Sequence, residues 1–340
     1  MYEEKKLWIS YSAISLFSRC PHSYYLGYEY RNPETGNRIQ TVNPYLSLGS
    51  AVHETIEDLI DVPIKERIKI SLTERFSDIF NRYRGLKGGF ISSKKEEDFK
   101  KRGLEMVERV EKSLFLKRPS TKIKKFLPSV NLIGDNVKLV GNIDWVEVLP
   151  SGKAHIIDFK TGNNRESNQS LQLPIYRILA EENLPLEIEK TSYWYLQHDD
   201  SPAEHKIGEI ENHLKTIKEI AGAIKDAVET GYFPCKYNKR CFSCKEYEDI
   251  FNGNAELVDT DKKRKKDIFC IIKESDVVEK IMDEDFLNDK EKDIFKKRID
   301  RGEIEEDSAK KDIRKIKEKI KENLSKKELK VLVNLLKDEK

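Results

Sequence analysis

The sequence contains little that would mark a membrane or secreted protein. Its 340 residues include no apolar stretch near the ~20 residues that a membrane-spanning helix needs. The first residues, MYEEKKLWISYS, contain no apolar signal core and no small-residue cleavage site. We therefore expect a soluble, cytoplasmic protein with no membrane partner.

Cysteine is also scarce, and its count is odd. The five cysteines are Cys20, Cys235, Cys241, Cys244 and Cys270. In a reducing compartment an odd count argues against a disulfide framework and leaves metal binding open.

No excess of one charge and no ATP-binding motif is present. Lys and Arg number 63 and Asp and Glu 61, a net charge of +2 that by itself neither supports nor excludes DNA as a partner, because a balanced total can hide a basic face. The phosphate-binding pattern G-x-x-x-x-G-K-[ST] does not occur. Any ATP-driven motor would therefore be a separate chain.

Helical periodicity dominates the first third of the chain. Residues 8–30 predict a short helix capped by Ser12 and followed by an aromatic-rich segment. The segment LGSAVHETIEDLI (48–60) repeats apolar residues at helical spacing. Residues 64–125 predict further helices joined by a loop around 85–89.

The periodicity changes near residue 128. VNLIG, VKLVGNIDWVEVL and AHIIDFKTG are short β-branched runs separated by turn residues, which predict a three-stranded meander. A helix over 170–183, a strand over 191–199 and a helix over 207–230 that ends at Gly231 are expected next. This order of elements predicts a mixed α/β core.

The region 252–340 has a different composition. About half of its residues are charged, with both signs interspersed, and apolar residues recur at helical spacing. We expect a helical C-terminal appendage here, after a first domain over 1–251 that contains a helical insertion at about 63–125. A solvated helix pair is the simplest interpretation, and an element that binds a protein partner or DNA is the alternative.

Two acidic residues and a lysine occur in the predicted strands. Asp158 and Lys160 lie two positions apart in IIDFKTG, so both side chains face the same side of a strand. Asp144 lies in the neighbouring run GNIDWVEV. Two carboxylates can hold Mg²⁺ or Mn²⁺, and a lysine can orient a metal-bound water or stabilise charge on a phosphate. Taken singly, each residue could equally form a structural ion pair or a turn cap.

Two helical pairs accompany these residues. His53 and Glu57 are four residues apart, and so are Gln172 and Tyr176, so each pair shares one helix face. An ordinary packing role is the alternative for each of them.

Taken together, these motifs resemble the RecB-like branch of the PD-(D/E)XK nuclease superfamily. The resemblance covers roughly residues 8–250 and lies in the ordered segments SYSAISLFSRCPHSYYLGY, LGSAVHETIE, GNIDWVEV, IIDFKTG and QLPIY. It implies the restriction-endonuclease-like core of this superfamily, a mixed sheet flanked by helices.

The resemblance also implies roles for the site residues. Asp144 and Asp158 would bind the metal, assisted by the backbone carbonyl of Phe159 and by His53. Lys160 would be the catalytic lysine. Residues Gln172 and Tyr176 would match the helix motif that supports the lysine and contacts DNA, with Glu57 in an indirect role.

The implied activity is metal-dependent hydrolysis of phosphodiester bonds in DNA, which leaves 5′-phosphates. We expect an exonuclease or end-processing enzyme of recombination, repair, phage replication or CRISPR adaptation, acting on single strands or free ends. Two alternatives are a catalytically inactive DNA-binding scaffold and a zinc-stapled interaction module.

The cysteines add a second resemblance. AddB-type subunits and CRISPR-associated exonucleases hold a [4Fe–4S] cluster with one N-terminal and three C-terminal cysteines, a role that Cys20, Cys235, Cys241 and Cys244 would fill here. The spacing departs from that family, since C-x5-C-x2-C replaces C-x2-C-x5-C. Zinc and no metal are the alternatives. Cys270 is expected to pack in the C-terminal region.

Candidate DNA contacts are basic or aromatic. They are the lysine-rich segment Ser92–Lys101, the run KKRKK at 262–266, and the aromatic residues Tyr24, Tyr25, Tyr28 and Tyr30. Solvated loops and core tyrosines are the ordinary alternative for each.

Overall fold

The computed structural model describes residues 6–123, 128–237, 241–301 and 307–332. The chain forms two compact units. The first contains Met1–Arg31, Tyr45–Asn81 and Lys100–Lys245, and the second contains Asn32–Pro44, Arg82–Phe99 and Glu246–Lys340. The second unit therefore includes two segments from the first third of the chain, which a single boundary at residue 251 does not anticipate.

Among the described residues, eight strands belong to the first unit. They are β1 (Leu7–Ile9), β3 (Ser120–Thr121), β4 (Ser129–Ile133), β5 (Val137–Val140), β6 (Trp145–Val148), β7 (Ala154–Lys160), β8 (Ile188–Tyr195) and β9 (Ala203–Glu204). Helices α1 (Tyr11–Arg19), α2 (Pro21–Tyr24), α3 (Pro44–Glu57), α4 (Ile64–Arg67), α5 (Leu72–Phe80), α6 (Ser93–Lys112), α7 (Gln172–Asn183) and α8 (Ile210–Thr230) precede, separate and follow them. A π-helix, Tyr25–Glu29, follows α2.

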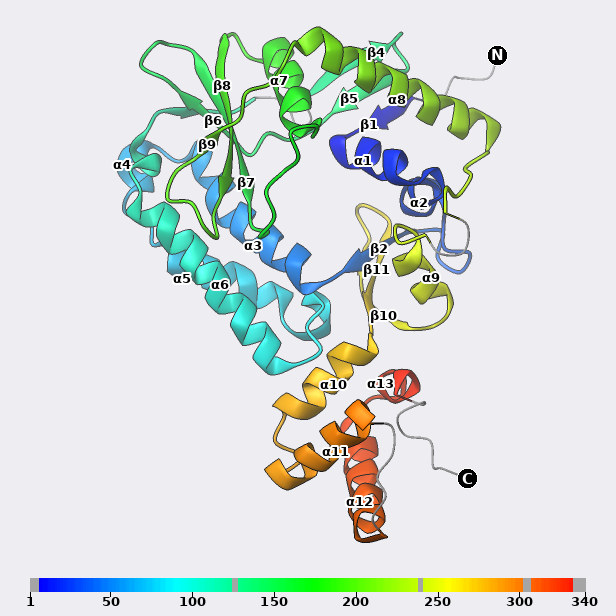
Figure 1. Ribbon diagram of the computed structural model, residues 1–340. Helices are drawn as coiled ribbons and strands as arrows, with labels where there is room; N and C mark the ends of the chain where they lie inside the picture. The colour runs from blue at the N-terminus through cyan, green and yellow to red at the C-terminus, as the bar shows by residue number, and fades with distance from the viewer. Residues whose placement is uncertain (1–5, 124–127, 238–240, 302–306, 333–340) are drawn as a thin grey trace. The chain divides into compact units, whose positions relative to one another are not determined.

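The strands of the first unit form two sheets. One has the order β3-β6-β7-β8-β9, in which β7 and β8 are parallel and the other pairs are antiparallel. The other has the order β1-β5-β4. Helix α7 connects the parallel strands β7 and β8 and contacts both of them, as a crossover connection requires (Figure 1).

The expected three-stranded meander is instead two hairpins in different sheets. Strands β4 and β5 pair in one sheet, and β6 and β7 pair in the other. Residues 141–144 between β5 and β6 are not part of any strand. The run VKLVGNIDWVEVL predicts a single strand because apolar residues resume directly after this break, but the break divides the run into β5 and β6.

Side chains along β7 point alternately to an aromatic face and to a face with charged residues. Phe159 packs with Phe115, Trp145 and Trp194 on one side, with ring centroids 5.9 to 6.5 Å from its own. On the opposite side Ile156 joins the main apolar core with residues of α7. Asp158 and Lys160 share that second side, since side chains alternate along a strand.

Helix ends follow the local sequence. Ser10, and not Ser12, caps α1, because its hydroxyl accepts a hydrogen bond from the backbone N–H of Ala13 at 3.3 Å. Helix α8 ends at Gly231 as predicted, and this glycine has the left-handed conformation (φ 68°) typical of helix C-termini.

A buried polar chain crosses the larger sheet. His155 Nδ1 lies 3.0 Å from a carboxylate oxygen of Glu147, and its Nε2 lies 2.7 Å from the hydroxyl of Ser192. This Ser-His-Glu order resembles a nucleophilic triad, but the Ser192 side chain is almost fully buried. The chain therefore satisfies polar groups across three adjacent strands and offers no accessible nucleophile.

The second unit combines a small sheet with helices. Strands β2 (Arg38–Val42), β10 (Ala255–Asp261) and β11 (Lys266–Ile271) form a sheet with the order β10-β11-β2, and helices α9 (Lys245–Phe251), α10 (Glu274–Asp283), α11 (Asp289–Arg301), α12 (Asp307–Asn323) and α13 (Lys326–Val331) accompany it (Figure 1). The C-terminal helices are present as expected. The hairpin β10–β11 was not anticipated, because its partner β2 lies more than two hundred residues earlier in the sequence.

The second unit has its own apolar core. Ile272, Val277, Ile281, Ile316 and Ile320 are buried together. Cys270 is buried on β11, apart from the other cysteines, as expected. Among the described residues, no helix is long and apolar enough to cross a membrane.

Candidate active site and cysteine cluster

The carboxylates and the lysine lie at neighbouring strand ends. Asp144 immediately precedes β6, and its Oδ2 accepts a hydrogen bond from the backbone N–H of Phe159 on β7 at 2.8 Å. Lys160 Nζ lies 3.0 Å from Asp158 Oδ2. The antiparallel pairing of β6 and β7 therefore brings Asp144 beside the Asp158–Lys160 pair.

Helix α3 places His53 and Glu57 at the same site. His53 Nδ1 lies 2.6 Å from Glu57 Oε1 and 3.5 Å from Asp144 Oδ2. Gly49, one turn earlier, allows this approach, because a Cβ atom there would lie 3.3 Å from the Thr161 hydroxyl just beyond β7. Helix α3 thus lies close to the end of β7.

The first residue of α7 links the charged groups. The Gln172 side-chain oxygen accepts a hydrogen bond from Lys160 at 2.5 Å, and its nitrogen donates to Asp158 Oδ1 at 2.7 Å and to the Tyr176 hydroxyl at 3.2 Å. A lysine can only donate and a carboxylate only accepts, so the amide orientation is fixed by its partners. Gln172 and Tyr176 are both mostly buried.

Two contacts of Lys160 were not predicted from the sequence. Glu166 Oε1 lies 3.2 Å from Lys160 Nζ, and the ammonium lies 5.1 Å from the centre of the Tyr193 ring. The Glu166 backbone is held by a hydrogen bond to the Tyr195 hydroxyl at 2.8 Å. Glu166 belongs to a polar loop whose path depends on this contact, so no periodicity could have identified it. Tyr193 lies beside Asp158 in the β7–β8 register, which the folded chain sets.

The surroundings of Lys160 favour its charged form. Burial alone would lower the pKa of its ammonium, but the carboxylates of Asp158 and Glu166 outweigh burial and raise that pKa above its ordinary value. The side chain is therefore a cation near neutral pH. It can donate to an anionic oxygen, but it is not a base.

Three metal-ligating side chains converge at this site. Ligand atoms of His53, Glu57 and Asp144 all lie within 4.8 Å of one another. Glu57 is thus brought directly into the group, although the sequence suggested an indirect role. Asp158 is close enough to raise the pKa of Asp144, but it lies outside this group of three and contacts Lys160 and Gln172 instead.

The same groups fit a divalent cation electrostatically. Burial, followed by repulsion between the two carboxylates, raises the pKa of Asp144 well above its ordinary value. Within the described residues, the buried Asp158 Oδ2 has no hydrogen-bond donor in suitable geometry, although the Lys160 ammonium lies nearby. Buried carboxylates of this kind are costly unless a cation compensates them, and their oxygens are the ligands that Mg²⁺ and Mn²⁺ prefer.

A cavity of about 340 Å³ opens beside Glu57 and Asp144. Apolar side chains such as Ile60 and Ile143 line it together with polar ones such as Asn142. Its volume falls within the range of about 300–1,000 Å³ that is usual for small-molecule sites.

Without a bound cation, this site should make folding stability depend on pH. Burial lowers the pKa of His53, but Asp144 and Glu57 outweigh burial and raise it from 6.5 to about 9. The folded state then holds more protons than the unfolded state, so stability present below pH 6.5 is lost as the pH rises towards 9. We expect the free energy of unfolding in EDTA to fall by roughly 3 kcal/mol across this window.

Urea unfolding in EDTA at several pH values measures this effect. His53→Gln should flatten the profile, whereas His198→Gln, which changes an exposed histidine outside the site, should retain it. A wild-type profile as flat as that of His53→Gln would contradict the assignment.

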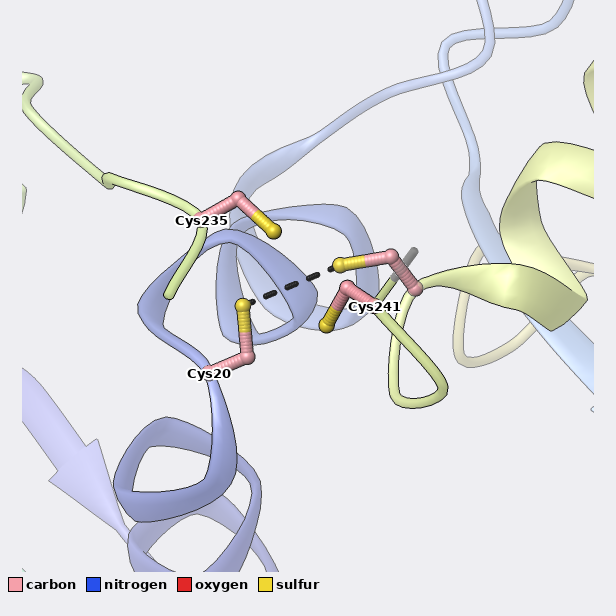
Figure 2. A group of neighbouring side chains, drawn as sticks. Cys20, Cys235 and Cys241 are labelled. Carbon is pink, nitrogen blue, oxygen red and sulfur yellow. Dashed lines mark hydrogen bonds between the residues drawn. The ribbon is translucent and has the colours of Figure 1, made fainter. Parts of the chain in front are cut away.

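Four cysteines form a second cluster of ligands. The sulfur atoms of Cys20, Cys235, Cys241 and Cys244 all lie within 4.8 Å of one another. Figure 2 shows the side chains of Cys20, Cys235 and Cys241 pointing into one common space, from the blue segment between α1 and α2 and from the yellow-green segment after α8. The unusual C-x5-C-x2-C spacing therefore does not prevent the four thiols from meeting.

Local structure supports this arrangement. Cys20 ends α1, with its backbone N–H bonded to Leu16, and Pro21 starts α2 directly after it. Cys20 Sγ lies 3.8 Å from Cys244 Sγ. Burial raises the pKa of the Cys20 thiol, but backbone hydrogen bonds from Lys236 and Ser23 outweigh burial and lower it to about 7. Thiolate is the form that binds metal, so the environment of Cys20 favours a ligand.

Two of the predicted DNA contacts have other roles. Tyr24 is buried and stacks on Tyr28, with centroids 4.9 Å apart, so it cannot stack on a base. Lys94 and Lys95 lie in the first turn of α6, and they pair with Asp283 and Asp276 at 2.9 and 2.8 Å. These lysines are neutralised by α10, so the lysine-rich segment is not a free basic loop.

Tyr25 and Tyr30 are half-buried and pack against each other edge to face.

Comparison with known families agrees with the fold. Residues 8–249 match the model of the PD-(D/E)XK nuclease superfamily, and the chain belongs to that superfamily. No curated protein sequence matches the chain. Membership implies a metal-dependent nuclease in broad terms, while the RecB-like branch and the individual residue roles remain predictions.

Proposed function

We propose that this protein is a Mg²⁺- or Mn²⁺-dependent deoxyribonuclease whose active site is built from Asp144, Asp158 and Lys160. The observation that carries the proposal is the hydrogen-bonded network in which Gln172 joins Lys160 to Asp158 beside the ligand group of His53, Glu57 and Asp144. Two buried carboxylates and a cation together are difficult to explain as a stabilising feature, since an apolar replacement is often as stable.

Each group has a distinct role in this proposal. Asp144, Asp158, His53 and the Phe159 carbonyl would hold the cation, with Glu57 as an additional ligand. A cation held there would activate a water molecule and would offset the charge that develops on the phosphate. Lys160 donates to a phosphate oxygen, which its raised pKa supports. Gln172 and Tyr176 hold the lysine and the carboxylate in position.

The substrate follows from the shape of the site and from the family. The cavity beside Glu57 and Asp144 has room for a nucleotide next to the reacting phosphate. By resemblance to the RecB-like branch, we infer an exonuclease or end-processing enzyme that acts on single strands or free ends. Its process would be recombination, repair, phage replication or CRISPR adaptation.

The cysteine cluster is proposed to hold a metal that joins both ends of the nuclease core. The order of the cysteines resembles that of [4Fe–4S] exonucleases. Zinc is the second candidate, and the distance between sulfur atoms supports it. Four thiolates in a tetrahedron with Zn–S near 2.3 Å lie about 3.8 Å apart, and Cys20 Sγ and Cys244 Sγ are separated by 3.8 Å. A cluster of four irons and four sulfides needs its thiolates farther apart.

The test is cleavage of end-labelled single- and double-stranded DNA by the full chain with Mg²⁺, Mn²⁺ or EDTA. We expect metal-dependent cutting that is lost in EDTA and in Asp158→Asn, which keeps the shape of the side chain but removes its charge. Fragment lengths will show the polarity and the strand preference. If the wild type does not cut with either metal, the proposal fails and a DNA-binding scaffold becomes the better explanation.

A further inference from the structure

A strongly basic hairpin lies in the second unit, outside the site described above. Residues 262–265 form the turn between β10 and β11, and Lys266 begins β11. All four turn residues, Lys262, Lys263, Arg264 and Lys265, are exposed cations. Arg38, on the neighbouring strand β2, lies directly beside Lys266 in the parallel register. We call residues 262–266 and Arg38 the basic hairpin.

Acidic partners for these cations are few. Within the described parts of the chain, Asp261 forms the only ion pair with the hairpin, at 3.9 Å from Arg264. Lys266 donates a hydrogen bond to the uncharged side chain of Gln40 at 2.8 Å. By contrast, Lys94 and Lys95 in the same unit are paired with carboxylates at normal ion-pair distances. The charge of the basic hairpin is thus largely uncompensated.

Two features of the hairpin oppose local stability. Lys265 has a φ of 52°, in the left-handed region that favours glycine or asparagine. Lys266 and Arg38 are like charges at directly paired positions, which destabilises a sheet. Burial, followed by repulsion from Arg38, lowers the pKa of Lys266. Strained or repulsive groups of this kind are typical of functional surfaces, where a ligand compensates them.

We propose that the basic hairpin binds the sugar–phosphate backbone of DNA. A nucleic-acid strand carries closely spaced negative charges, and lysine and arginine side chains bind them without reading base sequence. The choice of DNA as the polyanion rests on the proposed nuclease function. The second unit is then a substrate-binding element of the enzyme.

Binding can be measured without catalysis. Fluorescence anisotropy of labelled single- and double-stranded DNA in EDTA compares the full-length wild type with the triple variant Lys262→Glu, Lys263→Glu and Lys265→Glu. We expect at least about tenfold weaker binding by the variant. The slope of log K against log salt concentration for duplex DNA should decrease by about 2 to 3.

A matched control carries the same charge change elsewhere in the second unit. Lys296, Lys315 and Lys321 are exposed lysines on α11 and α12, and their triple replacement by glutamate should weaken binding far less. Equal losses in the two triple variants would overturn the proposal, because net charge alone would then explain them.

The substitution Lys265→Gly separates binding from folding. Glycine suits the left-handed conformation, so the melting temperature should stay the same or rise, while DNA affinity falls. Unchanged affinity would count against the hairpin.

Anionic lipid vesicles provide the last comparison. If the triple variant in the basic hairpin loses binding to vesicles but not to DNA, the surface binds a membrane and the proposal is overturned. None of these measurements depends on cleavage. They therefore distinguish a protein that cuts DNA without using the basic hairpin from one that binds DNA through the hairpin but does not cut it.

Discussion

Replacing Lys160 by methionine is expected to lower kcat for DNA cleavage by about 10²- to 10³-fold, the usual loss when one charge-stabilising donor is removed from an active site. Methionine has a similar length but no charge, so the polar contacts to Asp158, Glu166 and Gln172 disappear together. Single-turnover cleavage under saturating Mg²⁺ or Mn²⁺ gives the rate, and circular dichroism shows whether the variant is folded.

The matched control for this variant is Lys153→Met. Lys153 immediately precedes the same strand, β7, at the end opposite Lys160, where it pairs with Glu187 on the surface at 2.7 Å. This variant should cut DNA at close to the wild-type rate. Cutting by Lys160→Met at the control rate would remove Lys160 from the mechanism, and cutting by Lys160→Arg at an intermediate rate would show that charge alone supplies part of its effect.

Replacing Cys20 by serine is expected to destabilise the protein by about 3 to 5 kcal/mol, comparable to the loss of a native cross-link. A metal bound by Cys20 and the late cysteines would close a loop of about two hundred residues, and long loops give such a link its largest effect on the unfolded chain. The melting temperature should fall on the order of 10 °C for a domain of this size.

Cys270→Ser is the control for this loss, because Cys270 is equally buried but lies outside the cluster. If Cys20→Ser loses no more stability than the control, the four cysteines carry no metal that matters to folding. Metal analysis and visible absorption of the purified wild type distinguish an iron–sulfur cluster from a zinc ion. Iron together with a broad visible absorption would indicate a cluster, and one zinc per chain without colour would indicate a single ion.

Much of the active site was predictable because the strand period and the helix period are local properties. Asp158 and Lys160 share a face of β7 by alternation alone, and Gln172 and Tyr176 meet because four residues form about one helical turn. The position of Glu166 could not be predicted in this way. Its contact with Lys160 depends on a loop held by Tyr195, which only the folded chain brings close.

The second unit shows the same limit over a longer range. Its helices were predicted from spaced apolar residues, whereas its sheet was missed, because the sequence of β10, AELVDTD, is mostly polar and lacks the apolar alternation that marks a strand. The pairing of residues 38–42 with 266–270 is set by backbone hydrogen bonding and carries no signal in either segment alone.

The amino-acid sequence by itself determined the α/β class, most of the helices, the superfamily and the acid–lysine motif, because each of these depends on spacing along the chain. Only the tertiary structure decided that Glu57 joins the ligand group, that four unusually spaced cysteines meet, and that Lys94 and Lys95 are paired, whereas the basic hairpin has a single ion pair among the described residues. Those outcomes depend on distances between segments far apart in sequence, and the packing of the whole chain sets these distances.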